Sequence, residues 1–405
     1  DGLMAYSNNN WSAININVTP ELQGKELWDF LDVAVHPETR KVYGAALIEG
    51  LLEWDGENFT IYDDSNSSLN NAVGDDTRTR VSNLDFDAQN NLWMTNHLAT
   101  RPISVLKNDG DWQSFALPSA CSGQTQLEQV LVDENNYKWF VTGSNSGGLL
   151  VYDTGDNLES VSDDRCRLFT SSNSELPSNI VNTISMDRDG ELWVGTSQGV
   201  VVFQAFDPFD ANADFYAPRT DQNATNKGLL LSTEDVNCIA IDGADRKWFG
   251  TTNGVFVTSS DGTVQEARFT TENSPLFDDT ILDIAIDPNS GEVFIGTASG
   301  LISYKGKAIA ANQVNRSDAY AYPNPVRPDY EGPIAIKGLA EDANVKITDA
   351  NGQLIYETTA FGGQAIWDGT DYNGRRASTG VYLVFSTNKN IFVPDAAVAK
   401  ILFVH

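Results

Sequence analysis

The stretch that decides the fold is residues 173–200, NSELPSNIVNTISMDRDGELWVGTSQGV. Its segment 181–187 alternates apolar and polar residues with a period of two, which is typical of a half-buried strand. Asp187 then opens a turn over 188–190, because its carboxylate can accept hydrogen bonds from the backbone N–H groups just ahead. A second strand over 191–196 carries Trp193, and a short loop ending at Gly199 precedes a third strand. The stretch therefore predicts consecutive antiparallel strands joined by tight turns.

The same pattern recurs along the chain: an apolar strand, then an aspartate, then an aromatic residue six or seven positions later. The strand segments are 30–36, 81–87, 127–133, 181–187, 236–242 and 281–287. The aromatic residues follow at intervals of 46 to 55 residues, as Tyr43, Trp93, Trp139, Trp193, Trp248 and Phe294. Further apolar segments in each repeat supply a third and a fourth strand. Four antiparallel strands in a unit of about 40–50 residues are the pattern of a propeller blade.

The predicted fold is all-β: a β-propeller followed by a small β-sandwich. The chain opens inside a repeat, because residues 2–6 and Trp11 have the pattern of a third and a fourth strand. We therefore expect six recognisable blades plus a leading half-blade, which makes six or seven in total. The expected domains are 1–18 as the end of a preceding blade or closing strands, 19–307 as the propeller, 308–320 as a linker and 321–405 as the sandwich. The linker is polar, so we expect it to allow some relative motion.

The composition excludes some partners. The chain has 405 residues and a formal net charge of −30, with 56 acidic against 26 basic residues. Nucleic-acid binding needs a local excess of cations, so this balance argues against such a partner. No segment approaches the roughly 20 apolar residues of a membrane helix.

The region after the last repeat has a different pattern. Tyr322-Pro-Asn-Pro325 holds two prolines close together, which favours extended chain over helix. The segments 349–352 (DANG) and 371–374 (DYNG) are typical of turns. Strand-like segments surround these turns, at 334–337, 345–349, 353–356, 365–367, 381–385 and 398–404. This region of about 85 residues is therefore predicted to be a β-sandwich.

Two sets of motifs resemble known families. Residues 173–200 resemble the regulator-propeller repeat, which is common in the sensor halves of Bacteroidetes hybrid two-component systems. The C-terminal motifs resemble the sorting domain of type IX secretion cargo: YPNP at 322–325, DANG at 349–352, WDGT at 367–370, TGVY at 379–382 and KILFV at 400–404. The two together resemble the C-terminal half of a surface component of the type IX secretion machinery.

This resemblance implies a function that no residue chemistry in the chain shows. It implies a non-enzymatic component of an attachment complex on the extracellular side of the outer membrane, which binds anionic lipopolysaccharide and presents it to a sortase. The implied partners are that sortase and attachment-complex proteins of the PorU, PorV and PorQ type, with no cofactor. Two other functions stay open: an extracellular ligand-sensing propeller of a two-component-type system, and an exported cargo protein that carries a sorting domain.

A catalytic constellation is not evident in the sequence. Of the three histidines, His36 replaces the turn aspartate of the first repeat, His97 follows a strand and His405 ends the chain. The sequence contains no His-x-x-x-His pair and no Cys-x-x-Cys. The one match to Gly-x-Ser-x-Gly, at Gly195–Gly199, lies between two predicted strands and not in the strand-to-helix turn of a nucleophile elbow. With 56 acidic residues, pairs of carboxylates arise by chance and indicate nothing. We therefore expect no enzyme.

Two sets of residues are candidates for ligand binding. In the second repeat, Arg78, Arg80 and Arg101 fall in loops at one end of the strands, and guanidinium groups suit phosphate. The alternative is that these arginines pair with nearby acids such as Asp75. Calcium is the other candidate ligand, with Asp368, Asp371 and Asn373 as its residues, although plain turns explain the same segment.

Two further predictions concern packing. The recurring aromatic residues should be buried between adjacent blades, because they occupy one position in every repeat. Cys121 and Cys166 are assigned to opposite ends of a strand, roughly 17 Å apart, which predicts that they form no disulfide. Cys238 lies in an inner strand, where a small buried thiol is expected.

Overall fold

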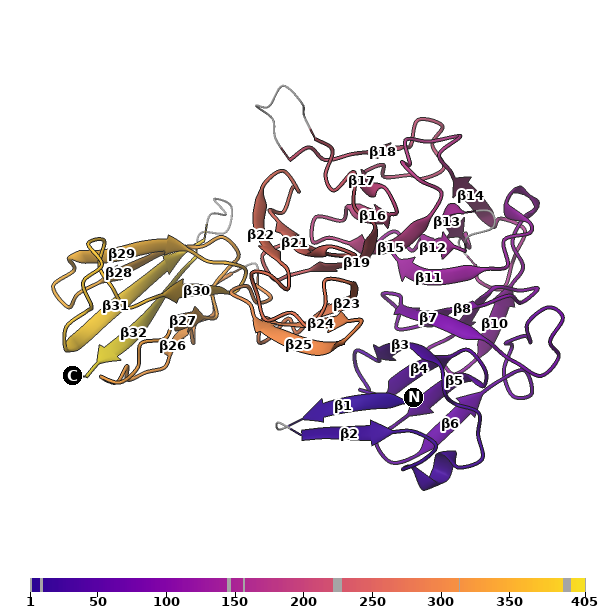
Figure 1. Cartoon of the computed structure of the whole chain (residues 1–405), viewed down its shortest axis with the longest axis horizontal. Helices are drawn as coiled ribbons and strands as arrows, with labels where there is room; N and C mark the ends of the chain where they lie inside the picture. Colours follow the sequence, from indigo (N-terminus) through magenta and orange to yellow (C-terminus); the bar gives the residue numbers. More distant parts are fainter. Residues whose placement is uncertain are drawn as a thin grey trace. The chain divides into compact units, whose positions relative to one another are not determined.

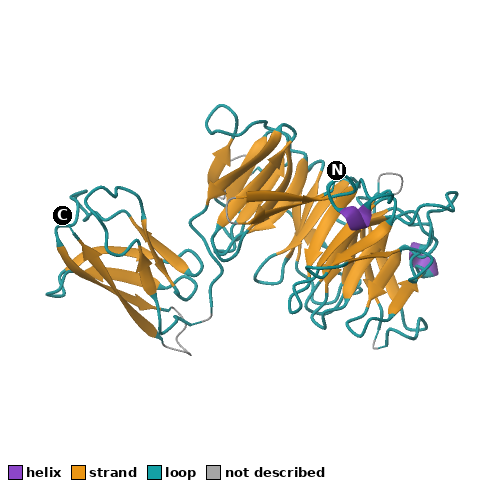
Figure 2. Ribbon diagram, turned by 90° about the horizontal axis from the view of Figure 1, so that it is seen from below, coloured by secondary structure: helices purple, strands orange, loops and turns teal. Residues whose placement is uncertain are grey.

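The computed structural model describes residues 2–7, 10–143, 147–155, 157–220, 228–312, 314–388 and 395–404. Within these residues strands dominate, and the helical turns are two short 3-10 segments, η1 (Pro20–Leu22) and η2 (Ser119–Cys121) (Figure 2). None of the helices is long and apolar enough to span a membrane in the part of the chain that the structure describes. The fold is all-β, as predicted.

Between Phe30 and Lys305 the described strands form six successive antiparallel sheets, each of which is a blade (Figure 1). Blade one consists of β3 (Phe30–Val35), β4 (Val42–Ala46), β5 (Gly50–Trp54) and β6 (Phe59–Tyr62). Blade two consists of β7 (Val81–Phe86), β8 (Leu92–Asn96), β9 (Ile103–Leu106) and β10 (Trp112–Phe115). Blade three consists of β11 (Leu127–Val132), β12 (Lys138–Thr142), β13 (Gly148–Asp153) and β14 (Arg165–Phe169). Blade four consists of β15 (Val181–Met186), β16 (Leu192–Thr196), β17 (Gly199–Phe203) and β18 (Phe215–Tyr216).

Two more blades follow, and the second of them has three strands. Blade five consists of β19 (Val236–Ile241), β20 (Lys247–Thr251), β21 (Gly254–Thr258) and β22 (Gln265–Phe269). Blade six consists of β23 (Ile281–Ile286), β24 (Glu292–Thr297) and β25 (Gly300–Lys305). In all six blades the first strand ends one residue before the aspartate of the repeat, or before His36 in blade one. The repeat therefore predicted the inner strands correctly.

The chain divides into two compact units. The first comprises 1–217 and 231–236, and the second comprises 218–230 and 237–405. Blades one to four belong to the first unit, where each apolar core is shared by two neighbouring blades. A hairpin of β1 (Leu3–Ser7) and β2 (Asn10–Ile14) packs its Leu3 and Ile14 against blade one. This hairpin corresponds to the half-blade expected from residues 2–11.

The second unit contains blades five and six and the C-terminal β-sandwich. One sheet of the sandwich has the order β26 (Tyr320–Tyr322), β27 (Ile334–Lys337) and β30 (Gln364–Trp367). The other has the order β29 (Leu354–Thr359), β28 (Asn344–Thr348), β31 (Gly380–Thr387) and β32 (Ala396–Phe403). Both sheets contribute to one apolar core around Trp367, which is fully buried. The prolines of Tyr322-Pro-Asn-Pro325 follow cis peptide bonds.

The segment between blade six and the sandwich is hydrogen-bonded on both sides, whereas the sequence suggested a linker that permits motion. The backbone N–H of Ala310 donates to the carbonyl of Pro288 at 2.7 Å. On the other side, the N–H of Gly363 donates to the carbonyl of Ile309 at 2.9 Å, and Ile309 is buried. These bonds tie the start of the segment to its flanking sheets. The assignment of 308–320 as a linker remains a proposal.

Candidate functional site

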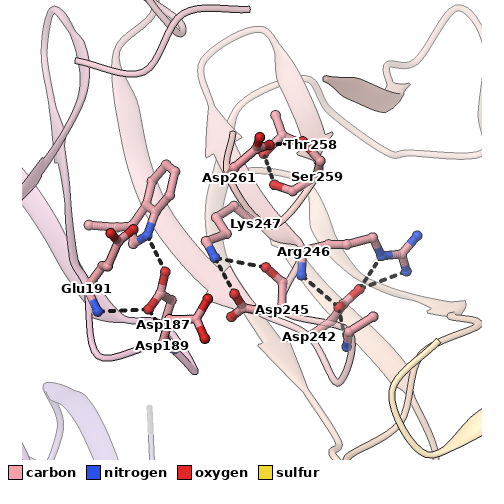
Figure 3. Close-up of polar contacts among 12 residues, drawn as sticks. Asp187, Asp189, Glu191, Asp242, Asp245, Arg246, Lys247, Thr258, Ser259 and Asp261 are labelled. Atoms are coloured by element: carbon pink, nitrogen blue, oxygen red, sulfur yellow. Dashed lines mark hydrogen bonds and ion pairs between the residues drawn. The ribbon is translucent and has the colours of Figure 1, made fainter. Parts of the chain in front are cut away.

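The aspartate of the repeat has two tasks, which Asp187 illustrates (Figure 3). Its Oδ1 accepts the backbone N–H groups of Asp189 at 3.0 Å and Glu191 at 2.8 Å, which closes the predicted turn. Its Oδ2 accepts the indole N–H of Trp193 at 2.8 Å. The same indole bond recurs in blades two, three and five, at 2.9, 2.9 and 3.0 Å. We did not predict it, although the constant spacing of six residues between aspartate and tryptophan was the available signal.

The tryptophans of the repeat are buried as predicted. Trp93, Trp139, Trp193 and Trp248 are at most 2% exposed. Phe294 in blade six is only half-buried, so the prediction holds less well there. Because each indole N–H has a carboxylate acceptor, the tryptophans are structural anchors and their hydrogen-bonding groups are not free for a ligand.

Blade one departs from this arrangement. His36 replaces the aspartate, and its Nδ1 accepts the N–H groups of Glu38 and Thr39 at 3.1 and 3.2 Å. Tyr43 replaces the tryptophan and is also buried. Glu53 supplies a carboxylate in this blade, and it accepts a hydrogen bond from Lys41 Nζ at 2.6 Å.

These residues line a notch between blades one and two. We call it the blade-one notch, and six of the residues that line it are His36, Lys41, Tyr43, Glu53, Tyr62 and Phe86. The cavity has a volume of about 180 Å³. The equivalent notch between blades three and four is lined by Asp133 and Trp139, and its volume is only about 60 Å³. The sequence showed that blade one departs from the repeat, but we did not predict the space that results.

Buried charges elsewhere in the blades are paired within the protein. In blade five, Arg246 Nη2 lies 2.7 Å from Asp242 Oδ2, and Lys247 Nζ lies 2.8 Å from Asp245 Oδ2 (Figure 3). Lys138 in blade three is fully buried, and its Nζ donates to Thr154 Oγ1 at 2.9 Å. Burial lowers the pKa of Lys138 to about 8. These charged groups therefore already have partners within the protein.

The candidate arginines of blade two lie in adjoining connections. The N–H of His97 donates to the carbonyl of Arg80 at 2.8 Å, so the connection 97–102, which carries Arg101, lies against the connection that carries Arg78 and Arg80. Asp75 pairs with both of the latter, at 3.8 Å from Arg78 and 3.3 Å from Arg80. This pairing is the alternative that the sequence left open. Arg101 is exposed.

The calcium candidates are used by turns. Asp368 Oδ1 accepts the N–H and hydroxyl groups of Thr370 at 3.0 and 2.6 Å. Asp371 Oδ1 accepts the N–H groups of Asn373 and Arg375 at 2.8 and 2.9 Å, and the pKa of Asp371 is lowered mainly by the bond from Arg375. In the described part of the chain, no group of three or more His, Cys, Asp or Glu residues is placed to hold a metal ion.

The prediction that Cys121 and Cys166 remain unpaired is wrong. They form a disulfide with a Cα–Cα distance of 6.2 Å, within the range that a disulfide spans. The prediction places the two cysteines at opposite ends of one blade. In the structure, Cys121 lies in η2, in the connection from blade two to blade three. That connection passes beside β14, the outermost strand of blade three, and Cys166 is inside this strand. Cys238 is a free, buried cysteine, as predicted.

Comparisons with known proteins agree with this fold. The family model of the two component regulator propeller matches residues 175–198. No curated protein matches the sequence. The structure is similar to that of PorZ, described as an essential bacterial surface component of the type-IX secretion system of Porphyromonas gingivalis, with a TM-score of 0.71 and 24% identity. The match covers 99% of this chain and 55% of PorZ, so the chain spans about half the length of that protein.

Other solved structures match more weakly. The extracellular domain of a putative hybrid two-component system from B. thetaiotaomicron has 13% identity and a TM-score of 0.49, over 93% of this chain and 50% of that one. A gluconolactonase from Xanthomonas campestris has 16% identity and a TM-score of 0.42, over 68% of this chain and 85% of that one. Neither carries an argument about function. The likeness to PorZ confirms the predicted resemblance and shows a shared fold.

Proposed function

We propose that this chain is a non-enzymatic component of a type IX secretion attachment complex at the cell surface. In this role it binds anionic lipopolysaccharide and presents it to a sortase, with partners of the PorU, PorV and PorQ type. The observation that carries the proposal is the likeness to PorZ, which extends over both the propeller and the sandwich. The disulfide between Cys121 and Cys166 supports export, because disulfides persist in oxidising compartments outside the cytosol.

The arginines of blade two are the proposed anion site. Arg78 and Arg80 share one carboxylate, that of Asp75, so the two positive charges meet a single negative one. Exposed ion pairs of this kind are weak, and a phosphate group can take over the guanidinium donors. In addition, Arg80 Nε is buried and has no hydrogen-bond partner among the described residues. Arg101 adds an exposed guanidinium from the adjoining connection.

The sandwich is the proposed docking module, and it stays attached in the working protein. Its second sheet carries exposed apolar residues in register on β31 and β32. Val381 pairs with Leu402 and Phe385 pairs with Val398, and all four side chains are 40% exposed or more. Apolar side chains placed directly opposite one another on a sheet face favour contact with a protein partner.

Lipopolysaccharide binding tests the proposal. The full chain is titrated with purified anionic lipopolysaccharide, in parallel with a variant carrying Arg78→Gln, Arg80→Gln and Arg101→Gln. Because each lost guanidinium–phosphate contact weakens binding, we expect the variant to bind at least about tenfold more weakly. The matched control is Arg40→Gln, an exposed arginine in the turn between β3 and β4, and it should bind like the parent. Equal binding by the triple variant would refute the site.

A pull-down from solubilised outer membranes tests the complex. Recovery of a sortase supports the proposal. The match to the regulator propeller favours a second candidate, an extracellular sensor, and recovery of a sensor kinase would support that instead.

Mass spectrometry of the protein from its native membrane tests whether the sandwich is retained. An intact C-terminus supports docking. A mature form that ends near Ala321 would show an exported cargo protein, which loses its sorting domain.

A further inference from the structure

The blade-one notch differs from its counterpart in blade three in one pair of residues above all. In blade three, Trp139 lines the notch and its indole N–H donates to Asp133 Oδ2 at 2.9 Å. In blade one, a phenol ring stands in place of the indole, and His36 turns its Nδ1 to the backbone of its own turn. The cavity beside this exchange is about 180 Å³, against about 60 Å³ in blade three. The exchange keeps the blade intact, since β3 and β4 pair as the first two strands of the other blades do.

The charges at the notch are neutralised within the protein. Lys41 pairs with Glu53 at 2.6 Å, and Glu53 also accepts a hydrogen bond from the hydroxyl group of Tyr62 at 3.3 Å. Lys107, which approaches from blade two, pairs with Glu159. A charged ligand would therefore gain little here, because it would have to separate one of these pairs. A neutral ligand with many hydroxyl groups can use the same lysines and carboxylate as donors and acceptors without separating them.

The remaining lining supplies amides and aromatic rings, of which Tyr43 and Phe86 are inclined to each other by 67°. Tyr43, Tyr62 and Phe86 contribute aromatic rings, and Asn90 and Asn108 contribute side-chain amides at the rim. Aromatic faces pack against apolar C–H groups, while amides give directional hydrogen bonds. The chemical class that presents both an apolar ring face and equatorial hydroxyl groups is a pyranose sugar.

From this geometry we infer that the blade-one notch binds a neutral saccharide unit. The site is distinct from the proposed arginine site, because the two lie at opposite ends of the strands. The notch is lined by the turns between β3 and β4, between β7 and β8, and between β9 and β10, together with side chains from the strands of blades one and two. The arginines instead lie in the connections from β6 to β7 and from β8 to β9. The inference therefore does not depend on lipopolysaccharide binding at the arginines.

The test is an array of neutral glycans probed with the full chain, followed by titration of the bound glycans. The key variant is His36→Asp with Tyr43→Trp, which restores the pair found in blades two to five and fills the notch. We expect it to fold, because the same pair is accommodated in four other blades, and to lose binding by about tenfold or more. Asn108→Ala, at an exposed rim position, should weaken binding without filling the notch.

The matched control is Asn135→Ala, an exposed residue of the smaller notch of blade three. It should bind like the parent chain. Three results would overturn the inference: no neutral glycan is bound, binding is confined to charged glycans, or binding survives in the folded His36→Asp, Tyr43→Trp variant. Thermal unfolding of each variant establishes that it is folded.

Discussion

Replacing Trp139 by phenylalanine removes the indole hydrogen bond and keeps an aromatic ring at this position. Trp139 is 1% exposed and stacks on Phe169, and a phenyl ring keeps this aromatic contact. What is lost is the donor to Asp133 Oδ2 at 2.9 Å, together with the part of the indole volume that a phenyl ring does not fill. A hydrogen bond to a charged group contributes about 1.5–3 kcal/mol. Because the smaller ring also packs less well, Trp139→Phe should lower the free energy of unfolding by at least that amount.

The free energy of unfolding that Trp139→Phe removes should depend on pH. Burial raises the pKa of Asp133 above its ordinary value of 3.8, and the bond from Trp139 opposes that rise. Without the indole, the pKa of Asp133 rises further. The folded state then holds a proton that the unfolded state releases, so stability falls as the pH rises from the unfolded pKa through the folded one. The cost of Trp139→Phe should therefore be full at neutral pH and smaller near about pH 4.

Urea unfolding of the full chain at both pH values measures this cost. Trp28→Phe is the control, because Trp28 is 43% exposed, and it should change the free energy of unfolding by less than about 0.5 kcal/mol at either pH. If Trp139→Phe is as mild as the control, the hydrogen bond contributes nothing. If its cost is the same at both pH values, Asp133 is not the acceptor that matters.

Two further predictions concern buried groups. Thiol titration of the denatured chain without reductant should find one thiol, that of Cys238, and a count of three would contradict the disulfide. Replacing both Cys121 and Cys166 by serine should lower the free energy of unfolding by about 4 kcal/mol, the value expected for a loop of this length. Burial lowers the pKa of Lys138 from 10.5 to about 8 in the folded state. Between these two pH values the unfolded state binds more protons than the folded state, so the free energy of unfolding should rise with pH across that window. Lys138→Met should remove this rise, and a rise that persists in the variant would show that another group causes it.

The parts of the fold that depend on local pattern could be predicted from the sequence. The inner strands were predicted to within a residue, because the period-two alternation and the turn aspartate that follows it both act over a few residues. The disulfide could not be predicted in the same way. The distance between Cys121 and Cys166 depends on the path of a connection between two blades, which no local pattern determines. The size of the blade-one notch likewise depends on side chains from two blades.

Where the repeat is regular, its polar groups are already used. The aspartate in blades two to five accepts turn amides and an indole N–H, so a residue that recurs in this way stabilises a blade and offers little to a ligand. Positions that depart from the repeat are under no such constraint. His36 and Tyr43 are the clearest departure, and they coincide with the enlarged notch. The connection that carries Arg78 and Arg80 is another, since basic residues gather there in a chain with a net charge of −30. Because the Asp–Trp pairs of the regular blades are already hydrogen-bonded, the two departures are the better candidates for ligand binding and should be tested before the regular blades.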